Sequence, residues 1–360
     1  MKFLFYINTL GSGGAERVIS LLANEMAARG HDVTLVLSFH VAEEYPVDEG
    51  VHLYVLEASE RHESKIKRNL SRIRKLRAVC RSEQPDVAIS FMQEPNFRLL
   101  VATRGLNIKT VVSIRNDPRR EYAGLLGAIV AKAIMPFADG YVFQTEDARR
   151  WFPESIQEKS TVIFNPVDCR FFNLRRGDQA KSGQRVMAVG RLVPQKNHAL
   201  LISAFESIAA GFPSASLEIV GDGNLKGQLQ EMISPELSSR IALTGRLDDV
   251  AEKLESTSVF VLSSDYEGLP NALMEALAAG VPSISSECPC GGPKLLIEHG
   301  VTGLLFPVGD KSRLAEELSR LLSDRSYAEA LGSKARARSL QTFSSPKVFD
   351  AWEQYLSSML

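Results

Sequence analysis

The chain has 360 residues, of which 44% are hydrophobic and 24% are charged, and its formal net charge is −1. This length exceeds that of one ordinary domain and suits two domains of about 150–180 residues each. The near-zero net charge excludes a chain that is basic throughout, so we expect no nucleic-acid partner and only local basic patches.

Short apolar runs alternate with helical patterns along the first half of the chain. A strand is predicted at 3–7, followed by a glycine loop and by a helix with one apolar face that ends at Gly30. Further strands are predicted at 33–38, 51–56, 86–91, 110–114, 141–145 and 161–166. Strands that alternate with helices favour a parallel sheet with helical crossovers. We therefore expect a Rossmann-like α/β domain in this half.

The longest apolar stretch of the chain is 123–138, and it contains Lys132. It is shorter than the roughly 18–20 residues that cross a bilayer, so it predicts a buried helix and not a membrane span.

The segment 167–184 is polar and is typical of a linker. After it, the alternation of strands and helices resumes. Strands are predicted at 185–190, 217–223, 241–246, 259–264, 281–286 and 303–307, and a last helix near 346–360. We expect two facing Rossmann-like domains with an interdomain crevice, where the carboxyl ends of parallel strands bind ligands.

The strongest motif is SSDYEGLPNALMEALAAGVP at 263–282. A strand ends at Ser264, Glu267 follows in the loop, and a helix begins near Pro270 and contains Glu275 about one turn inside. The free N–H groups at a helix N-terminus attract a diphosphate, and carboxylates accept hydrogen bonds from sugar and ribose hydroxyls. Taken alone, the two glutamates are also compatible with a surface loop charge and an exposed helix residue.

Two cations follow the first strand of the same half, in the sequence VGRLVPQKN. Gly190 lets the backbone approach a ligand closely, and Arg191 and Lys196 lie where they can neutralise a leaving diphosphate. The next two strands end in the glycine loops GDG (221–223) and TGR (244–246). Alternatively, Arg191 and Lys196 are surface charges that only improve solubility. This alternative does not explain why several strand-end loops suit a nucleotide diphosphate.

Together, GRLVPQKN, VGDG, TGR and the spacing of Glu267 and Glu275 resemble the donor site of family 4 of the retaining glycosyltransferases. That family has the two-domain GT-B fold, and the resemblance covers the whole chain, including TLGSGGAERV at 9–18. The run at 267–293 is very similar to bacterial members that build lipid-linked oligosaccharides and polysaccharides, including the GalNAc-adding enzymes of N-glycan assembly.

The resemblance implies a metal-independent transfer of a hexose or N-acetylhexosamine from a UDP-sugar to a glycan or a polyprenyl-diphosphate-linked acceptor. The catalytic set would be Arg191 and Lys196 on the donor diphosphate and Glu267 on the hydroxyls of the transferred sugar. The full set of implied donor contacts is Gly14, Gly190, Arg191, Lys196, Gly221, Arg246, Glu267, Gly268, Leu269, Pro270, Asn271 and Glu275.

The resemblance also implies a discontinuous first domain. Residues 1–170, completed by the last helix at 346–360, would bind the acceptor, and residues 184–340 would bind the donor. The glycine loop GSGGAER at 11–17 would close over phosphate or acceptor. A dinucleotide site would need an acid near the end of the second strand, where this chain has Ser38. A loop with a purely structural role, as a turn, is the alternative.

Three residues at strand ends of the first half are candidates for the acceptor side. Many family members have a histidine in the sequence SIRNDP, where this chain has Arg115 and Asn116, so a histidine base is in doubt here. Arg115 would stabilise phosphate charge or orient the acceptor, or it would form a structural salt bridge. Glu94, just past another strand, is a further candidate for an acceptor contact.

A basic amphipathic helix is predicted near 62–82, since 61–81 contains nine Lys or Arg residues and one Glu. A solvated cationic helix is one interpretation. The other is attraction to an anionic membrane surface or to a polyprenyl-diphosphate acceptor, with Lys67, Arg68 and Arg72 as the candidate contacts.

Cysteine and histidine usage predicts no metal site and no cofactor. Only Cys288 and Cys290 lie close together, and no second cluster has ligand spacing. Scattered reduced thiols are typical of the cytoplasm. We therefore expect a cytoplasmic protein, and the basic helix near 62–82 favours peripheral contact at the inner face of the cytoplasmic membrane.

Two other functions remain open on sequence alone. A nucleotide-sugar epimerase or phosphorylase of similar shape would need crevice acids, histidines or a phosphate site that the sequence does not reveal. A non-catalytic nucleotide-sugar-binding protein would bind the donor without turnover.

Overall fold

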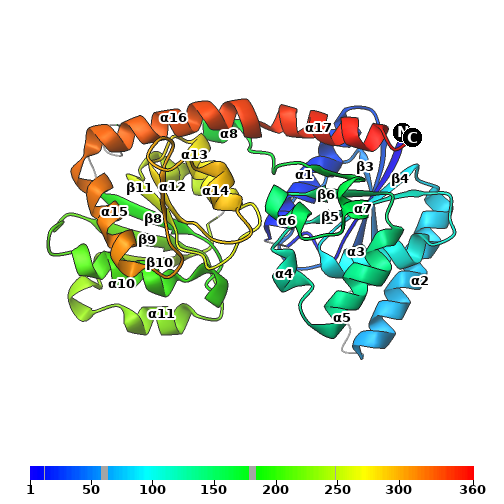
Figure 1. Ribbon diagram of the computed structural model, residues 1–360, viewed down its shortest axis with the longest axis horizontal. Coiled ribbons are helices and arrows are strands. Elements are labelled where there is room, and N and C mark those ends of the chain that lie inside the picture. The colour runs from blue at the N-terminus through cyan, green and yellow to red at the C-terminus, as the bar shows by residue number, and fades with distance from the viewer. Residues whose placement is uncertain (12, 58–63, 178–183, 248) are drawn as a thin grey trace. The chain divides into compact units, whose positions relative to one another are not determined.

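The computed structural model describes residues 1–11, 13–57, 64–177, 184–247 and 249–360, and it divides into two units. Unit 1 comprises Met1–Asn165 and Pro346–Leu360, and unit 2 comprises Pro166–Ser345. Each unit is an α/β domain around its own parallel sheet, with helices on both faces (Figure 1). The predicted fold class, two parallel-sheet α/β domains, is confirmed.

The sheet of unit 1 has the strand order β3-β2-β1-β4-β5-β6-β7, and every described pairing in it is parallel. The strands are β1 (Lys2–Ile7), β2 (Asp32–Phe39), β3 (Val51–Glu57), β4 (Val87–Phe91), β5 (Lys109–Ile114), β6 (Gly140–Phe143) and β7 (Ser160–Val162). Residues 3–7 of β1 are all buried, because a central parallel strand is covered by helices on both faces. This explains why the run FLFYI is continuously apolar.

The helices of unit 1 connect these strands in sequence order. They are α1 (Gly14–Ala28), α2 (Lys65–Glu83), α3 (Gln93–Thr103), α4 (Pro118–Glu121), α5 (Gly124–Ile129), the π-helix η1 (Val130–Ile134), the 3₁₀ helix η2 (Met135–Phe137), α6 (Glu146–Arg150) and α7 (Glu154–Gln157). The C-terminal helix α17 (Ser345–Ser357) joins the same core. Its Trp352 is fully buried and stacks on Phe91 of β4, with ring centroids 5.6 Å apart.

The sheet of unit 2 has the order β10-β9-β8-β11-β12-β13 and is also parallel in its described pairings. Its strands are β8 (Arg185–Val189), β9 (Ser216–Val220), β10 (Ile241–Gly245), β11 (Val259–Leu262), β12 (Ser283–Ser286) and β13 (Leu304–Phe306). The strand order reverses direction at β8, since β9 lies on one side of it and β11 on the other. Such a switch point is where parallel sheets place ligands, beyond the carboxyl ends of the strands.

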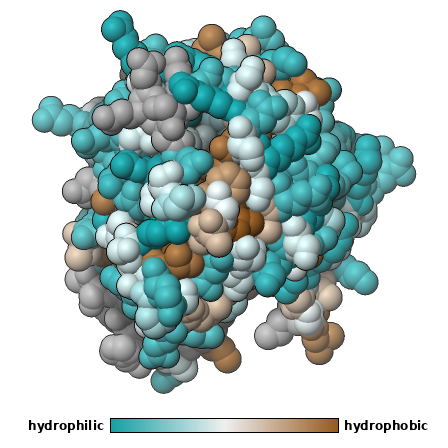
Figure 2. Space-filling view, turned by 90° about the vertical axis from the view of Figure 1, so that its left-hand side faces the viewer, coloured by the Kyte–Doolittle hydropathy of each residue, from teal (hydrophilic) through white to brown (hydrophobic). Residues whose placement is uncertain are grey.

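The helices of unit 2 cover both faces of that sheet (Figure 1). They are α8 (Cys169–Phe172), η3 (Pro194–Lys196), α10 (His198–Ile208), α11 (Lys226–Met232), η4 (Pro235–Leu237), α12 (Val250–Glu255), α13 (Asn271–Ala278), α14 (Gly292–Leu296), α15 (Lys311–Ser323) and α16 (Arg325–Phe343). Figure 2 shows a face of unit 2 that is mainly hydrophilic, with its apolar residues in small groups.

The segment expected to be a linker is, in its described part, an integral piece of unit 2. The backbone N–H of Val167 donates to the carbonyl of Phe343 at 2.9 Å. The guanidinium of Arg176 donates to the carbonyls of Gly280 and Thr257, each at 2.7 Å. These bonds anchor residues 166–177, whereas 178–183 lie outside the described residues. The polar side chain of Arg176 thus serves to hydrogen-bond backbone carbonyls of unit 2, and the segment is not a free linker.

The expectation of one buried helix at 123–138 is wrong. The stretch is divided into α5, η1 and η2, and it exposes three large apolar side chains. Leu125 is 80% exposed, Ile129 48% and Phe137 46%. The segment therefore exposes apolar side chains on its outer face, whereas a buried helix would enclose them. Within the described residues, no helix combines the length and the apolar character needed to cross a membrane.

Candidate functional site

The loops after β8 and β9 meet at the carboxyl edge of the unit 2 sheet. Gly190 donates its backbone N–H to Val220, and Leu192 donates to Asp222, both at 2.9 Å. Gly221 has a φ of 147°, and a Cβ at this position would collide with the carbonyl oxygen of Gly190. Only glycine allows this close approach, so the glycine of the GDG sequence fixes the shape of the loop that carries Arg191.

Lys196 and Glu267 form an ion pair at this edge. The ammonium nitrogen of Lys196 lies 2.5 Å from Oε1 of Glu267, and the hydroxyl of Ser264 donates to the same oxygen at 2.6 Å. The side chain of Lys196 is 16% exposed and that of Glu267 8%. The sequence placed both residues at strand ends, and the structure brings them into direct contact.

Four further hydrogen bonds join the Lys196 segment to the loop after β11. Asp265 donates its backbone N–H to the carbonyl of Gln195 at 2.9 Å, and the Gln195 amide donates to Tyr266 at 2.9 Å. The Asn197 amide donates to Asp265 at 2.8 Å, and Ser263 donates to the Lys196 carbonyl at 2.9 Å. The ion pair is therefore held on a rigid frame. Sequence reasoning missed this frame because its members are ordinary polar residues with no spacing signal.

The backbone of Glu267 is fixed by the segment that precedes α14. Its N–H donates to Pro289 at 2.7 Å, and its carbonyl accepts from the N–H of Cys290 at 2.9 Å. A Cβ on Gly292 would collide with the carbonyl oxygen of Gly268. The sequence CPCGG thus serves to pack this segment closely against the Glu267 loop.

The remaining donor-side candidates fall into three environments. Gly268, Leu269, Pro270 and Glu275 are buried, Glu275 being 6% exposed, so it is not the exposed helix residue that was the alternative. Asn271 opens α13 and is half-buried. Arg191 and Arg246 are exposed on the loops after β8 and β10. Gly14 opens α1 and belongs to unit 1.

Arg115 is a buried cation at the carboxyl edge of the unit 1 sheet. One guanidinium nitrogen donates to Asn165 Oδ1, which also accepts from the Gln144 amide at 2.7 Å. Its Cζ lies 4.5 Å from the centroid of the Phe91 ring. Burial lowers the pKa of Arg115 to about 9, and the Glu16 carboxylate opposes this shift.

The structural salt bridge considered for Arg115 is not observed. No Asp or Glu oxygen of the described residues lies within ion-pair distance of its guanidinium, and its Nε has no hydrogen-bond partner. The neighbouring Asn116 accepts the N–H of Asp117 at 2.9 Å, a bond that shapes the turn.

Glu121 is a buried carboxyl group that sequence reasoning missed. It ends α4, its Oε1 accepts the N–H of Gln93 at 3.2 Å, and its Oε2 is buried without a partner. Burial raises the pKa of Glu121 to about 7; the Gln93 N–H opposes this shift and the Asp117 charge adds to it. No spacing signal separates it from the surface charges of RREY.

The other acceptor-side candidates differ in accessibility. Glu94 pairs with Arg98 at 2.7 Å, and Arg98 also donates to Asn8 at 2.6 Å. Lys67 is exposed on α2, and Arg68 is half-buried.

The prediction that Arg72 forms part of a basic surface is wrong. Its guanidinium is 2% exposed and lies 3.0 Å from the buried Glu57, over the ring of Phe39. Helical periodicity placed it on the polar face, but the Glu57 carboxylate draws it inward. The apolar face is partly outside instead, since Ile66 is 81% and Leu70 48% exposed.

Among the described residues, no group of three or more His, Cys, Asp or Glu side chains is arranged to hold a metal ion.

Two family models match successive parts of the chain. The model described as Glycosyltransferase Family 4 matches residues 12–171, and the model described as Glycosyl transferases group 1 matches residues 183–324. Together they account for most of both units.

Curated relatives match along nearly the whole chain. The chain is 28% identical over 344 residues to the Campylobacter jejuni GalNAc-alpha-(1->4)-GalNAc-alpha-(1->3)-diNAcBac-PP-undecaprenol alpha-1,4-N-acetyl-D-galactosaminyltransferase, covering 94% of this chain and 93% of the relative. It is 26% identical over 352 residues to the N-acetylgalactosamine-N,N'-diacetylbacillosaminyl-diphospho-undecaprenol 4-alpha-N-acetylgalactosaminyltransferase of the same organism, with 94% of each chain covered.

Among solved structures, Anabaena HepE in complex with UDP and glucose has a TM-score of 0.82 to this chain at 20% identity. The match covers 99% of this chain and 100% of HepE. At this identity the likeness establishes the fold.

Proposed function

This chain belongs to glycosyltransferase family 4 and is a glycosyltransferase, and we propose that it transfers a hexose or N-acetylhexosamine from a UDP-sugar with retention of configuration. The acceptor is a glycan or a polyprenyl-diphosphate-linked sugar of cell-surface oligosaccharide or polysaccharide assembly. The observation that carries this proposal is the contact of Glu267 with both Lys196 and Ser264 at the switch point of the unit 2 sheet.

The Lys196–Glu267 ion pair can still form hydrogen bonds to a UDP-sugar. A lysine ammonium has three N–H donors, and one of them serves Glu267, so two remain for phosphate oxygens. The second oxygen of Glu267 can accept a hydroxyl of the transferred sugar. A cation fixed in advance stabilises the diphosphate as negative charge develops on it, without reorganisation during the reaction.

Other groups complete the donor site in this proposal. Arg191 is exposed on the loop after β8 and adds a second charge for the leaving diphosphate. The N–H groups at the start of α13 bind phosphate, Glu275 binds the ribose, and the backbone near Arg246 binds the base. With these cations present, we propose that no divalent metal is required and that the donor phosphate accepts the proton of the acceptor hydroxyl.

Unit 1 binds the acceptor in this proposal. Arg115 is buried and has only neutral polar partners, so an anionic phosphate of the acceptor would balance its charge. Two relatives are named for acceptors that carry a diphosphate on undecaprenol. Lys67 and Arg68 on α2 would contact the anionic inner face of the cytoplasmic membrane, where such acceptors reside.

The first test is a thermal-shift screen against UDP-, GDP- and ADP-sugars. We expect UDP-sugars to stabilise the wild type and both Lys196→Ala and Glu275→Ala to lose that stabilisation. Lys294→Ala is the matched control, because Lys294 also pairs with a glutamate, Glu287, but is 68% exposed. Stabilisation by another nucleotide class, or an unchanged shift in both site variants, would contradict the donor assignment.

Turnover is then measured with labelled UDP-sugar and a prenyl-diphosphate-linked glycan, and the anomeric configuration of the product is determined by NMR. We expect an axial linkage from the axial donor. A new UDP-sugar formed without acceptor would indicate an epimerase, and donor binding without any product would indicate a non-catalytic protein.

A further inference from the structure

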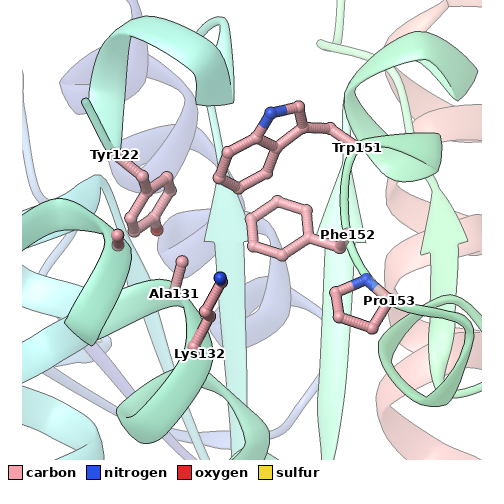
Figure 3. Close-up of a pocket in the computed structure, with 7 residues that line it drawn as sticks. Tyr122, Ala131, Lys132, Trp151, Phe152 and Pro153 are labelled. Carbon is pink, nitrogen blue, oxygen red and sulfur yellow. The ribbon is translucent and has the colours of Figure 1, made fainter. Parts of the chain in front are cut away.

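Unit 1 contains a pocket of about 370 Å³ on the flank of its sheet, where α5 and η1 face the end of α6 (Figure 3). It is lined by Tyr122, Ala131, Lys132, Trp151, Phe152 and Pro153, with Ala128 on the same helical segment. The volume lies near the lower end of the roughly 300–1,000 Å³ that ligand sites occupy. No sequence motif predicts this pocket, because its lining residues come from three separate segments.

Three aromatic rings line the pocket. Tyr122 stacks on Trp151 with centroids 6.0 Å apart, and Phe152 meets both rings edge to face at 5.7 and 4.8 Å. The Tyr122 hydroxyl is directed to the sulfur of Met135, so the ring and not the hydroxyl faces a ligand. Ala128 and Ala131 add only small side chains to the lining. Such a lining can bind an apolar chain through van der Waals contacts and the burial of apolar surface.

One cation borders this apolar lining. Figure 3 shows the ammonium group of Lys132 directed towards the ring of Phe152. Within the described residues this ammonium makes no ion pair or hydrogen bond. Arg119 and Arg120 are exposed on the neighbouring α4, whereas the acid beside them, Glu121, is largely buried. A ligand that is both apolar and anionic matches this combination.

The outer face of the same segment is apolar as well. Leu125 is 80% exposed and Ile129 48%, one helical turn apart and one turn before Lys132. Exposed apolar side chains followed by a cation are typical of a segment that enters the head-group region of a lipid surface. A chain that leaves a bilayer at this point has a short path into the pocket.

We propose that this pocket binds the isoprenoid chain of a polyprenyl diphosphate, with the chain against the rings of Tyr122, Trp151 and Phe152 and the diphosphate near Lys132. The inference rests on the proposed function, because it assumes a prenyl-diphosphate-linked acceptor. It adds a site that recognises the lipid itself and not the sugar. The volume admits a short stretch of chain, and the remainder stays in the membrane.

Intrinsic fluorescence provides a test that needs no turnover, since Trp151 lies in the pocket and the second tryptophan, Trp352, is fully buried elsewhere in unit 1. Farnesyl diphosphate is titrated into the wild-type protein. We expect a saturable change in emission, which disappears in Trp151→Phe and is absent with inorganic diphosphate alone. No saturable change, or an equal change in Trp151→Phe, would overturn the proposal.

A filled pocket supplies the second arm. Ala131→Phe places a ring in the cavity and should weaken farnesyl diphosphate binding at least tenfold. The matched control is Ala330→Phe at an exposed site on α16 in unit 2, which should bind like the wild type. Lys132→Glu keeps the cavity open and should weaken farnesyl diphosphate but not farnesol, so it tests the site if Ala131→Phe fails to fold. Binding that is equal in Ala131→Phe and wild type would overturn the proposal.

The two proposals can fail separately. If the protein transfers sugar to a prenylated acceptor and Ala131→Phe leaves the KM for that acceptor unchanged, the pocket assignment is wrong and the proposed function stands. If farnesyl diphosphate binds at Trp151 but no UDP-sugar is used with any acceptor, the proposed function is wrong and the pocket remains a prenyl-diphosphate site.

Discussion

The carboxyl edges of the two sheets balance their charges in opposite ways. In unit 2, Lys196 and Glu267 are paired at 2.5 Å, and Ser264 satisfies the same carboxylate oxygen. In unit 1, the buried guanidinium of Arg115 has neutral hydrogen-bond partners, and one oxygen of Glu121 has none. Both edges carry buried charge, but Lys196 and Glu267 form a direct ion pair, whereas neither Arg115 nor Glu121 does so among the described residues.

This difference separates a site that is stable before its ligand arrives from one that is incomplete. A buried ion pair that loses one member costs several kcal/mol, because the other charge is left without compensation. A buried charge without an ionic partner already costs stability, and a bound anion or hydroxyl would recover that cost. We therefore expect substitutions at the two edges to change stability in opposite directions.

The largest effect is expected for Lys196→Met. Transfer should fall by about 10²–10³ in kcat/KM, because a fixed cation at the leaving group is lost. The free energy of unfolding should fall by about 3 kcal/mol, since Glu267 is left buried and unpaired. Kinetics with saturating acceptor and urea unfolding measure the two quantities.

The control for this variant is Lys294→Met, whose exposed pair with Glu287 at 2.6 Å should contribute less than about 1 kcal/mol. If Lys196→Met is as stable as the wild type, the Lys196–Glu267 ion pair does not stabilise the folded protein.

The next effect is a pH dependence at the unit 1 edge. Burial raises the pKa of Glu121 from its ordinary value of 4.5 to about 7, so the folded state favours the protonated acid. Its contribution to stability is complete below pH 4.5 and is lost as the pH rises to 7. Glu121→Gln removes this loss. The free energy of unfolding of the variant should therefore exceed that of the wild type by roughly 3 kcal/mol at pH 8 and equal it near pH 4.5.

Urea unfolding of both proteins across pH 4.5–8 measures that difference. Parallel pH profiles would mean that the Glu121 carboxyl is solvated in the folded protein, and the contrast between the edges would then rest on Arg115 alone.

A smaller effect on stability, of opposite sign to that of Lys196→Met, is expected for Arg115→Met. Removing a buried cation without an ionic partner should leave the free energy of unfolding unchanged or raise it by about 1 kcal/mol. Transfer to a diphosphate-linked acceptor should fall about tenfold, the value of one charged hydrogen bond. Arg72→Met is the control within the same unit, because it leaves Glu57 buried and should destabilise by about 3 kcal/mol. A strongly destabilised Arg115→Met would show that Arg115 is structural.

The two edges also differ in how much of each could be predicted from the sequence. The strands and the location of Lys196 and Glu267 follow from apolar periodicity and from glycines at strand ends, because these are local signals. Their mutual contact is not local, since 71 positions separate them along the chain. The sequence identifies each member of the ion pair, and the sheet topology brings them together.

Where the sequence-based predictions failed, tertiary packing overrode the local sequence pattern. Arg72 lies on a polar stripe by periodicity, yet Glu57 from a neighbouring strand pulls it into the core. The apolar run at 123–138 predicts one buried helix, but the run is divided into α5, a π-helix at 130–134 and a 3₁₀ helix, and Leu125 of α5 is exposed. Glu121 carries no signal, because its burial depends on the N-terminus of α3, a segment 28 residues away.

The smallest effect concerns the surface of unit 1 and not its edge. Lys67 is exposed on α2 next to Ile66, which is 81% exposed, and one lysine near an anionic bilayer contributes about 1 kcal/mol. Lys67→Ala should therefore weaken co-sedimentation with phosphatidylglycerol vesicles about fivefold and leave the thermal stability and the UDP-sugar shift unchanged. Lys311→Ala, an exposed lysine of unit 2, should sediment like the wild type. Equal losses in both variants would assign the attraction to overall charge, and the proposal that unit 2 binds the donor while unit 1 contacts the membrane would lose its support.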